Sequence, residues 1–185
     1  MTDWLAFYSR FFTSTNEACS FVDACEAQRP PHNAAKLIMH QGQRLVSLAE
    51  DVPRIRPKWE SLQIFFLAVC AEAVAKLHAG PSVSLRSRQA VREFFCRLVP
   101  EPHRELLGEG FRTYRHYPLG TSAVADVLYE VRCSVAHEGS YWDFALHDGD
   151  TAMLSNDSEV IANLSPEELI EIVALGCINA AKERL

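Results

Sequence analysis

Apolar residues recur at intervals of three and four along most of this chain, which is the spacing of amphipathic helices. Prolines and glycines interrupt the spacing, notably at Pro30-Pro31 and at Gly80-Pro81. The pattern therefore predicts a mostly α-helical fold, with helices over residues 3–28 (in one or two pieces), 32–50, 57–77, 84–98, 101–107, 122–139 and from 165 onward.

The helix expected from Pro57 is apolar around most of its circumference, so we expect it to be the most buried one. Residues 53–57, PRIRP, indicate a rigid connector before it. The polar exceptions in the helix expected over 57–77 are Glu72 and Lys76, which are four residues apart and can form an ion pair. An alternative is that Glu72 orients a functional side chain across the core.

Residues 141–154 depart from the helical pattern. They alternate around Asp148-Gly149, which predicts a small β-hairpin. Ser165, Pro166 and Glu168 then have the spacing of a capping box at the start of the last helix. We see no internal repeat, and 185 residues fit one domain, 1–185, on which residues 1–50 pack as an N-terminal helical extension.

The stretch 122–139 combines a core face with chemically active side chains. Thr121 or Ser122 stands at the expected N-cap, and Gly139 stands where a helix usually ends. The side chains expected to face the core are Val124, Val127, Leu128, Val131 and Val135. The opposite side carries a row of four polar or reactive side chains, namely Asp126, Tyr129, Cys133 and His137.

The sequence from Arg132 to His137, RCSVAH, stands at the end of this helix and precedes Glu138-Gly139. It resembles the R-x4-6-H motif of HEPN domains, which are small helical domains and in many cases metal-independent ribonucleases of toxin–antitoxin and other defence systems. The resemblance covers residues 128–139, and helix order extends it from residue 57. It implies a HEPN-like helical bundle with Arg132 and His137 as catalytic residues. The supporting candidates are Tyr129, Cys133, Ser134, Glu138 and Glu72.

Metal-free RNA cleavage would use these two residue types directly. Histidine can transfer a proton near neutral pH, and arginine can bind two phosphate oxygens while staying charged. On an ideal helix, however, Arg132 and His137 lie about 140° apart. The resemblance implies a remedy, because members of the family often build a composite site at a homodimer interface. We therefore expect a symmetric dimer whose interface includes Tyr129, Cys133 and His137.

Cys133 departs from the family pattern, because active members commonly have Asn, Asp or His after the arginine. A thiol does not make the same hydrogen bonds. The alternative function is a non-catalytic HEPN-like module that binds RNA, a nucleotide or a partner protein. A further alternative is a purely structural dimerisation domain. Cys133 and His137 could also form a thiolate–imidazole pair or two zinc ligands, but no second spaced pair accompanies them, so we expect no metal and no cofactor.

Two basic segments are candidates for RNA binding. Arginines cluster in the helix expected over 84–98, and the loop 110–120 mixes cations with aromatic side chains, which suits phosphates and stacked bases. The candidates are Arg86, Arg88, Arg92, Arg112, Arg115 and His116. A solvated helix face and a loop with cation–π contacts are the alternative interpretations.

Composition narrows the class of protein. Hydrophobic residues make up 48% and charged residues 23%, which is typical of a globular domain, and the net charge of −6 argues against a generally basic nucleic-acid surface while allowing a local one. Six cysteines without a CxxC pair indicate reduced thiols. With no visible signal peptide or membrane span, we expect a cytoplasmic protein without membrane contact, and the resemblance adds RNA and an antitoxin protein as candidate partners.

Overall fold

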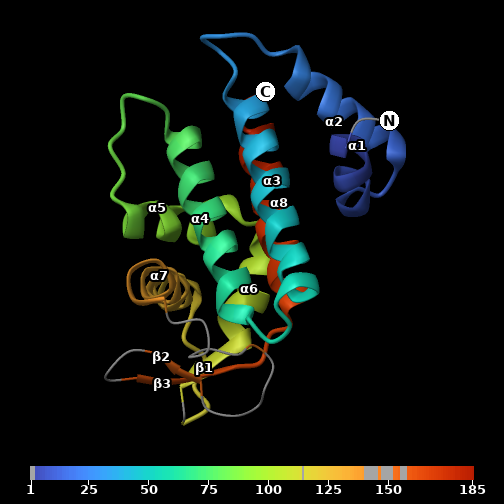
Figure 1. Cartoon of the computed structure of the whole chain (residues 1–185). Helices are drawn as coiled ribbons and strands as arrows, with labels where there is room; N and C mark the ends of the chain where they lie inside the picture. The colour runs from blue at the N-terminus through green and yellow to red at the C-terminus, as the bar shows by residue number, and fades with distance from the viewer. Residues whose placement is uncertain (1–2, 114, 140–145, 147–151, 155–157) are drawn as a thin grey trace.

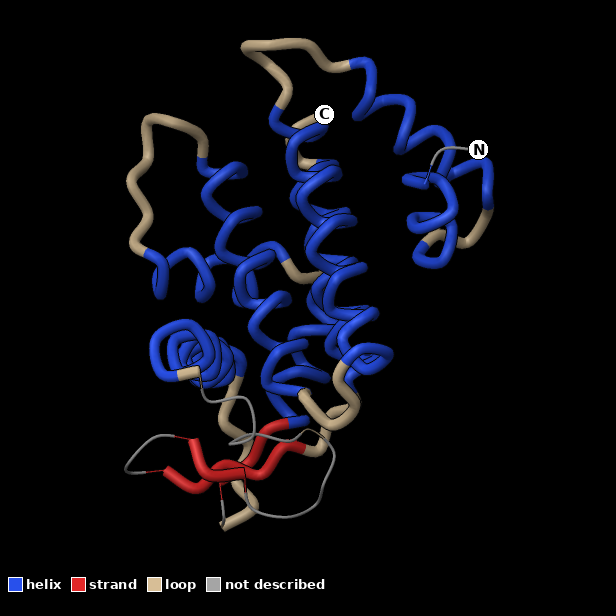
Figure 2. Tube along the Cα trace, viewed as in Figure 1, coloured by secondary structure: helices blue, strands red, loops and turns tan. Residues whose placement is uncertain are grey.

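The computed structural model describes residues 3–113, 115–139, 146, 152–154 and 158–185 (Figure 1). The described chain is mostly helical, as the apolar spacing predicts, with one small sheet (Figure 2). Its helices are α1 (Asp3–Tyr8), η1 (Ser9–Phe11), α2 (Thr15–Ala27), α3 (Ala34–Ile55), α4 (Glu60–Ala79), α5 (Ser87–Glu93), η2 (Phe94–Leu98), α6 (Glu101–Gly110), α7 (Thr121–Glu138) and α8 (Pro166–Lys182).

Helices α3, α4 and α8 pack against one another and run side by side through the centre (Figure 1). Helix α7 crosses α4 on one side and contacts α5 and α6, whereas α1 and α2 lie on the other side of the molecule against α3. Residues 34–50 thus belong to the central layer, and of the expected N-terminal extension, residues 1–50, only α1, η1 and α2 lie outside that layer. The core is apolar, with fully buried side chains such as Ile38, Ile64 and Phe94.

Helix α8, not α4, buries the larger share of its residues, which corrects the expectation for residues 57–77. Helices α3, α4 and α6 and the η2 turn surround α8. Helix α4 instead keeps Glu72 and Lys76 at a polar contact with α5. At one point α8 packs closely enough to need a glycine, because a Cβ on Gly176 would lie 2.6 Å from Cζ of Phe94.

Helix α3 continues through Pro53 to Ile55, so the prediction of a connector at 53–57 was wrong. Proline has no N–H to donate to the carbonyl four residues earlier, which is that of Ala49. The buried side chain of Gln63 on α4 supplies the missing donor, with its Nε2 3.1 Å from the Ala49 oxygen. Helix α4 correspondingly begins at Glu60 rather than at Pro57.

The ends and the inner face of α7 follow the sequence pattern, with one exception. Gly139 ends the helix in the left-handed conformation at φ 66°, and the five predicted core residues are all buried. The residue at the N-cap is Gly120, however, and Thr121 is the first helical residue. The Thr121 hydroxyl donates to the carbonyl of Arg104, 3.1 Å away, and so fastens α7 to α6. The capping box of Ser165 and Glu168 at the start of α8 is confirmed.

Three short antiparallel strands form a sheet in the order β1 (Phe111–Thr113), β3 (Ser158–Ala162) and β2 (Ala152–Leu154). Strand β2 falls within the predicted hairpin, but its described partner is β3, which the sequence pattern did not predict. The first strand of the predicted hairpin and its Asp148-Gly149 turn lie outside the described residues. Buried Phe111 and Val160 attach the sheet to the core.

Length and composition alone would allow α4 to cross a membrane. A central helix of a globular core passes the same test, and α4 is covered by α3, α5, α7 and α8. Within α4, 44% of the apolar window is buried inside the chain.

The side-chain amide of Gln63 should stabilise the fold because Pro53 has no N–H to donate to the Ala49 carbonyl. Gln63→Met leaves the Ala49 carbonyl buried without a donor, so we expect it to lower the free energy of unfolding by about 1–3 kcal/mol in urea titrations. In a Pro53→Ala background the helix N–H can replace the amide, and the same substitution should cost clearly less. Equal costs in both backgrounds would contradict this compensation.

Candidate functional site

The motif arginine contacts a carboxylate of the central helix. Nη2 of Arg132 lies 3.4 Å from Oε2 of Glu72, and the two side chains are 24% and 13% exposed. Nε of Arg132 and Oε2 of Glu72 are buried and make no hydrogen bond to the described residues. The arginine therefore lies at the α4–α7 contact, partly open to solvent and held by charge more than by hydrogen bonds.

Glu72 joins three helices. Its Oε1 accepts hydrogen bonds from Lys76 of α4 at 2.6 Å and from Ser87 of α5 at 2.7 Å, while Oε2 faces Arg132 of α7. We call these four side chains the Glu72 cluster. Burial raises the pKa of Glu72, but the hydrogen bonds from Lys76 and Ser87 and the charges of Lys76 and Arg132 outweigh burial and lower that pKa below its usual range. The carboxylate is thus ionised at neutral pH.

The cluster contains the predicted Glu72–Lys76 pair. It also contains the contact between Glu72 and Arg132, which an orienting role for Glu72 requires. Ser87 was missed by the sequence analysis, because a serine at a helix start is usually a cap. Only the packing of α5 on α4 brings its hydroxyl to Glu72.

Beside the cluster lie Tyr129 and Cys133, both half-buried. Contact with the Cys133 thiol, together with burial, raises the pKa of the Tyr129 hydroxyl, and Glu72 adds to this while Arg132 opposes it. The phenol stays protonated at neutral pH and can act as a hydrogen-bond donor. Arg88 covers its ring, with Cζ 5.2 Å from the ring centroid.

His137 is exposed in the last turn of α7, as is Glu138, and Ser134 is half-buried. No hydrogen bond or ion pair joins His137 to Arg132 within the part of the chain that the structure describes. The helix is regular up to Glu138, so the angular separation expected from the sequence remains in the folded chain. One copy of the chain therefore does not bring the imidazole and the guanidinium onto one small anion.

Two of the candidate RNA-binding arginines are engaged with acids of α7. Arg92 forms a two-pronged ion pair with Asp126, and Nη2 of Arg88 lies 3.2 Å from Oε1 of Glu130. These pairs join α5 to α7, and the two arginines cover Asp126 and Tyr129, the first two side chains of the polar row. Arg86, Arg112, Arg115 and His116 are exposed; Nε of Arg112 donates to the carbonyl of Glu109 at 3.3 Å.

Within the described residues, no group of three or more His, Cys, Asp or Glu side chains could hold a metal ion. The cysteines are free thiols, of which Cys25, Cys70 and Cys177 are buried. The thiols of Cys70 and Cys177 lie 3.6 Å apart between α4 and α8.

Comparison of the chain with protein-family models, with curated proteins and with solved structures finds no match.

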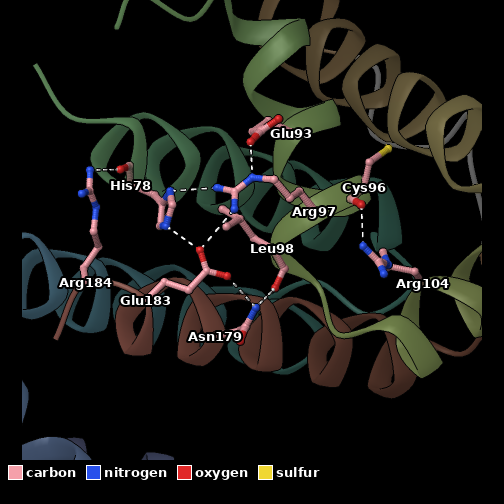
Figure 3. Close-up of polar contacts among 9 residues, drawn as sticks. All are labelled: His78, Glu93, Cys96, Arg97, Leu98, Arg104, Asn179, Glu183 and Arg184. Carbon is pink, nitrogen blue, oxygen red and sulfur yellow. Dashed lines mark hydrogen bonds and ion pairs between the residues drawn. The ribbon is translucent and has the colours of Figure 1, made fainter. Parts of the chain in front are cut away.

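A second polar network lies at the C-terminal end of α4, around His78 (Figure 3). Nη2 of Arg97 donates to Nδ1 of His78 at 3.0 Å, which leaves the proton of the neutral ring on Nε2, 2.9 Å from Oε2 of Glu183. Glu183 also accepts from Nδ2 of Asn179 and from Nη1 of Arg97. Burial and the charge of Arg97 lower the pKa of His78. The network joins the end of α8 to α4 and η2, which indicates a structural role.

The Glu72–Arg132 contact should show energetic coupling. In a double-mutant cycle with Glu72→Gln and Arg132→Met, we expect a coupling of about 1 kcal/mol in the free energy of unfolding. The exposed pair Asp51–Arg54 is the control, for which we expect less than about 0.5 kcal/mol. Because folding lowers the pKa of Glu72, the wild-type advantage over Glu72→Gln should be complete above pH 4.5 and should shrink as pH falls further. A cycle that closes without coupling would show that the contact contributes nothing.

His78 should make stability depend on pH at less acidic values than Glu72 does. Its pKa is below the ordinary 6.5 in the folded chain, so the unfolded chain binds a proton first as pH falls. Stability should therefore decrease below about pH 6.5, measured by urea unfolding. His78→Gln, which can still accept from Arg97 and donate to Glu183, should reduce that decrease. If His78→Gln leaves the pH profile unchanged, folding does not lower the pKa of His78.

Proposed function

We propose that this chain is a HEPN-like, metal-independent endoribonuclease of a bacterial toxin or defence type, with Arg132 and His137 of two associated copies forming the site. The observation that carries the proposal is the placement of Arg132, which is partly open to solvent and held by Glu72 beside a protonated phenol, five residues before an exposed His137 on the same helix. A guanidinium has five N–H donors, so an ion pair with one carboxylate does not exhaust it.

The proposed chemistry needs only these groups, solvent water and the RNA. The 2′-hydroxyl attacks the adjacent phosphorus, and the bond from phosphorus to the 5′-oxygen breaks, which leaves a 2′,3′-cyclic phosphate. His137, as the imidazolium, gives a proton to the departing 5′-oxygen, and solvent water takes the proton of the attacking 2′-hydroxyl. Arg132 neutralises the charge on the phosphate oxygens, and Glu72 positions Arg132. The exposed end of α7 supports this arrangement, because a second copy can reach His137 there.

A non-catalytic helical module is the second candidate. The same ion pair supports it, since Arg132 engaged by Glu72 also fastens α7 to α4, and Cys133 stands where active HEPN domains commonly have a polar side chain. In that case the motif would serve packing, and the chain would bind RNA, a nucleotide or a partner protein without cleaving RNA.

Purified chain incubated with single-stranded RNA in EDTA should produce cleavage. His137→Ala should lower the rate by about 100-fold or more, and Arg132→Ala by a similar factor. His103→Gln on α6 and Arg54→Ala on α3 are matched controls, and neither should change the rate. No cleavage by wild-type chain supports the non-catalytic module.

Mixing the two inactive variants tests the composite site. If Arg132 of one copy works with His137 of the other, mixed dimers of Arg132→Ala and His137→Ala contain an intact pair, and part of the activity should return. If both groups of a site come from one copy, the mixture stays inactive, and the two-copy geometry is wrong.

A further inference from the structure

An open groove lies at the end of the molecule opposite the sheet, where the start of α3, the end of α4 and the end of the chain come together (Figure 1). Its volume is about 1190 Å³. Four apolar side chains line it from three segments: Leu37 of α3, Leu77 of α4, and Val83 and Leu85 of the connection to α5. Leu37 is 41% exposed and Val83 is 51% exposed, so these side chains are not covered within the chain.

The charges around the groove have one sign. The charged side chains that line it are those of Lys76 and Arg184, and no side-chain carboxylate is among its lining residues. Lys76 shares the single carboxylate of Glu72 with Arg132, so that group of three charges is positive overall. Arg184 donates to the backbone carbonyl of His78. This local positive field contrasts with the net charge of −6 of the chain.

The size and shape of the groove fit a helix better than a small molecule. Small-molecule pockets are typically about 300–1,000 Å³ and enclose most of their ligand. A helix about 10 Å across and about ten residues long occupies about 1,200 Å³. Apolar side chains spaced three and four residues apart on such a helix would meet the leucines and valine of the groove, and acidic flanks would meet Lys76 and Arg184.

We propose that this groove binds an acidic amphipathic helix of a partner protein. A second copy of the chain is a poorer occupant, because a two-fold contact through this surface would bring Lys76 and Arg184 of one copy against the same cations of the other. The proposal concerns a surface beside the Glu72 cluster and holds whether or not the chain cleaves RNA.

Two stapled helical peptides of about 14 residues test the proposal, because stapling removes most of the cost of ordering a short helix. Both carry leucines spaced three and four residues apart; one has glutamates on its flanks and the other has lysines. In fluorescence anisotropy with the full chain, we expect the acidic peptide to bind about tenfold or more tightly than the basic one. The net negative charge of the chain would favour the opposite order, so this result would locate binding at the positive groove.

Val83→Glu and Leu37→Glu should each weaken binding of the acidic peptide by about tenfold or more. Ile55→Glu is the matched control, because Ile55 is 71% exposed and lies outside the groove, and it should leave binding unchanged. Arg184→Glu should reduce the preference for the acidic peptide over the basic one. Circular dichroism confirms that each variant is folded.

Three results would overturn the proposal. They are the absence of binding by the acidic peptide, equal binding of both peptides, and weakening by Ile55→Glu as large as that by Val83→Glu. Light scattering adds a fourth: if Val83→Glu converts a dimer into a monomer, the groove is an interface between copies of this chain and not a site for a partner helix.

Discussion

The arrangement around the motif depends on one carboxylate shared by three helices. Glu72 projects from α4, the helix at the centre of the bundle, and meets Lys76 on its own helix, Ser87 on α5 and Arg132 on α7. A half-buried carboxylate is stable in its charged form only if its partners replace the water it loses. Lys76 and Ser87 donate hydrogen bonds to Oε1, whereas Oε2 has only the charge of Arg132, and together these partners lower the pKa of Glu72. The same contacts join α5 and α7 to α4.

This constraint bears on both functional interpretations. A guanidinium that is already desolvated and oriented costs less to bring to a phosphate than one that is free in water, so the ion pair favours an anion-binding role for Arg132. The same pair would suffice to fasten two helices in a structural module. The two roles differ in what the solvent-facing side of Arg132 meets. His137, exposed five residues later on α7, is the group available for a shared site when two copies associate.

Positive side chains serve three different purposes in this chain. Arg88 and Arg92 join α5 to acids of α7, and Arg97 forms part of the His78 network that locks the end of α8. Lys76 and Arg184 border an open apolar groove. Three arginines of the basic segment 84–98 are thus paired with acids of the same chain, and only the tertiary structure places those acids beside them.

The sequence by itself determined the helical class, the inner face of α7, its end at Gly139 and the capping box of α8, because helix periodicity and helix ends depend on neighbours three and four residues away. It failed at Pro53, where a helix continues because Gln63 of another helix supplies the missing donor, and at β3, which needs β1 and β2 as partners. It also named Arg132, His137 and Glu72 as candidates without placing them. Only the tertiary structure decided that Arg132 faces Glu72 while His137 stays in solvent, since the helix angle separates the two residues but the packing of α7 on α4 decides which one meets the acid.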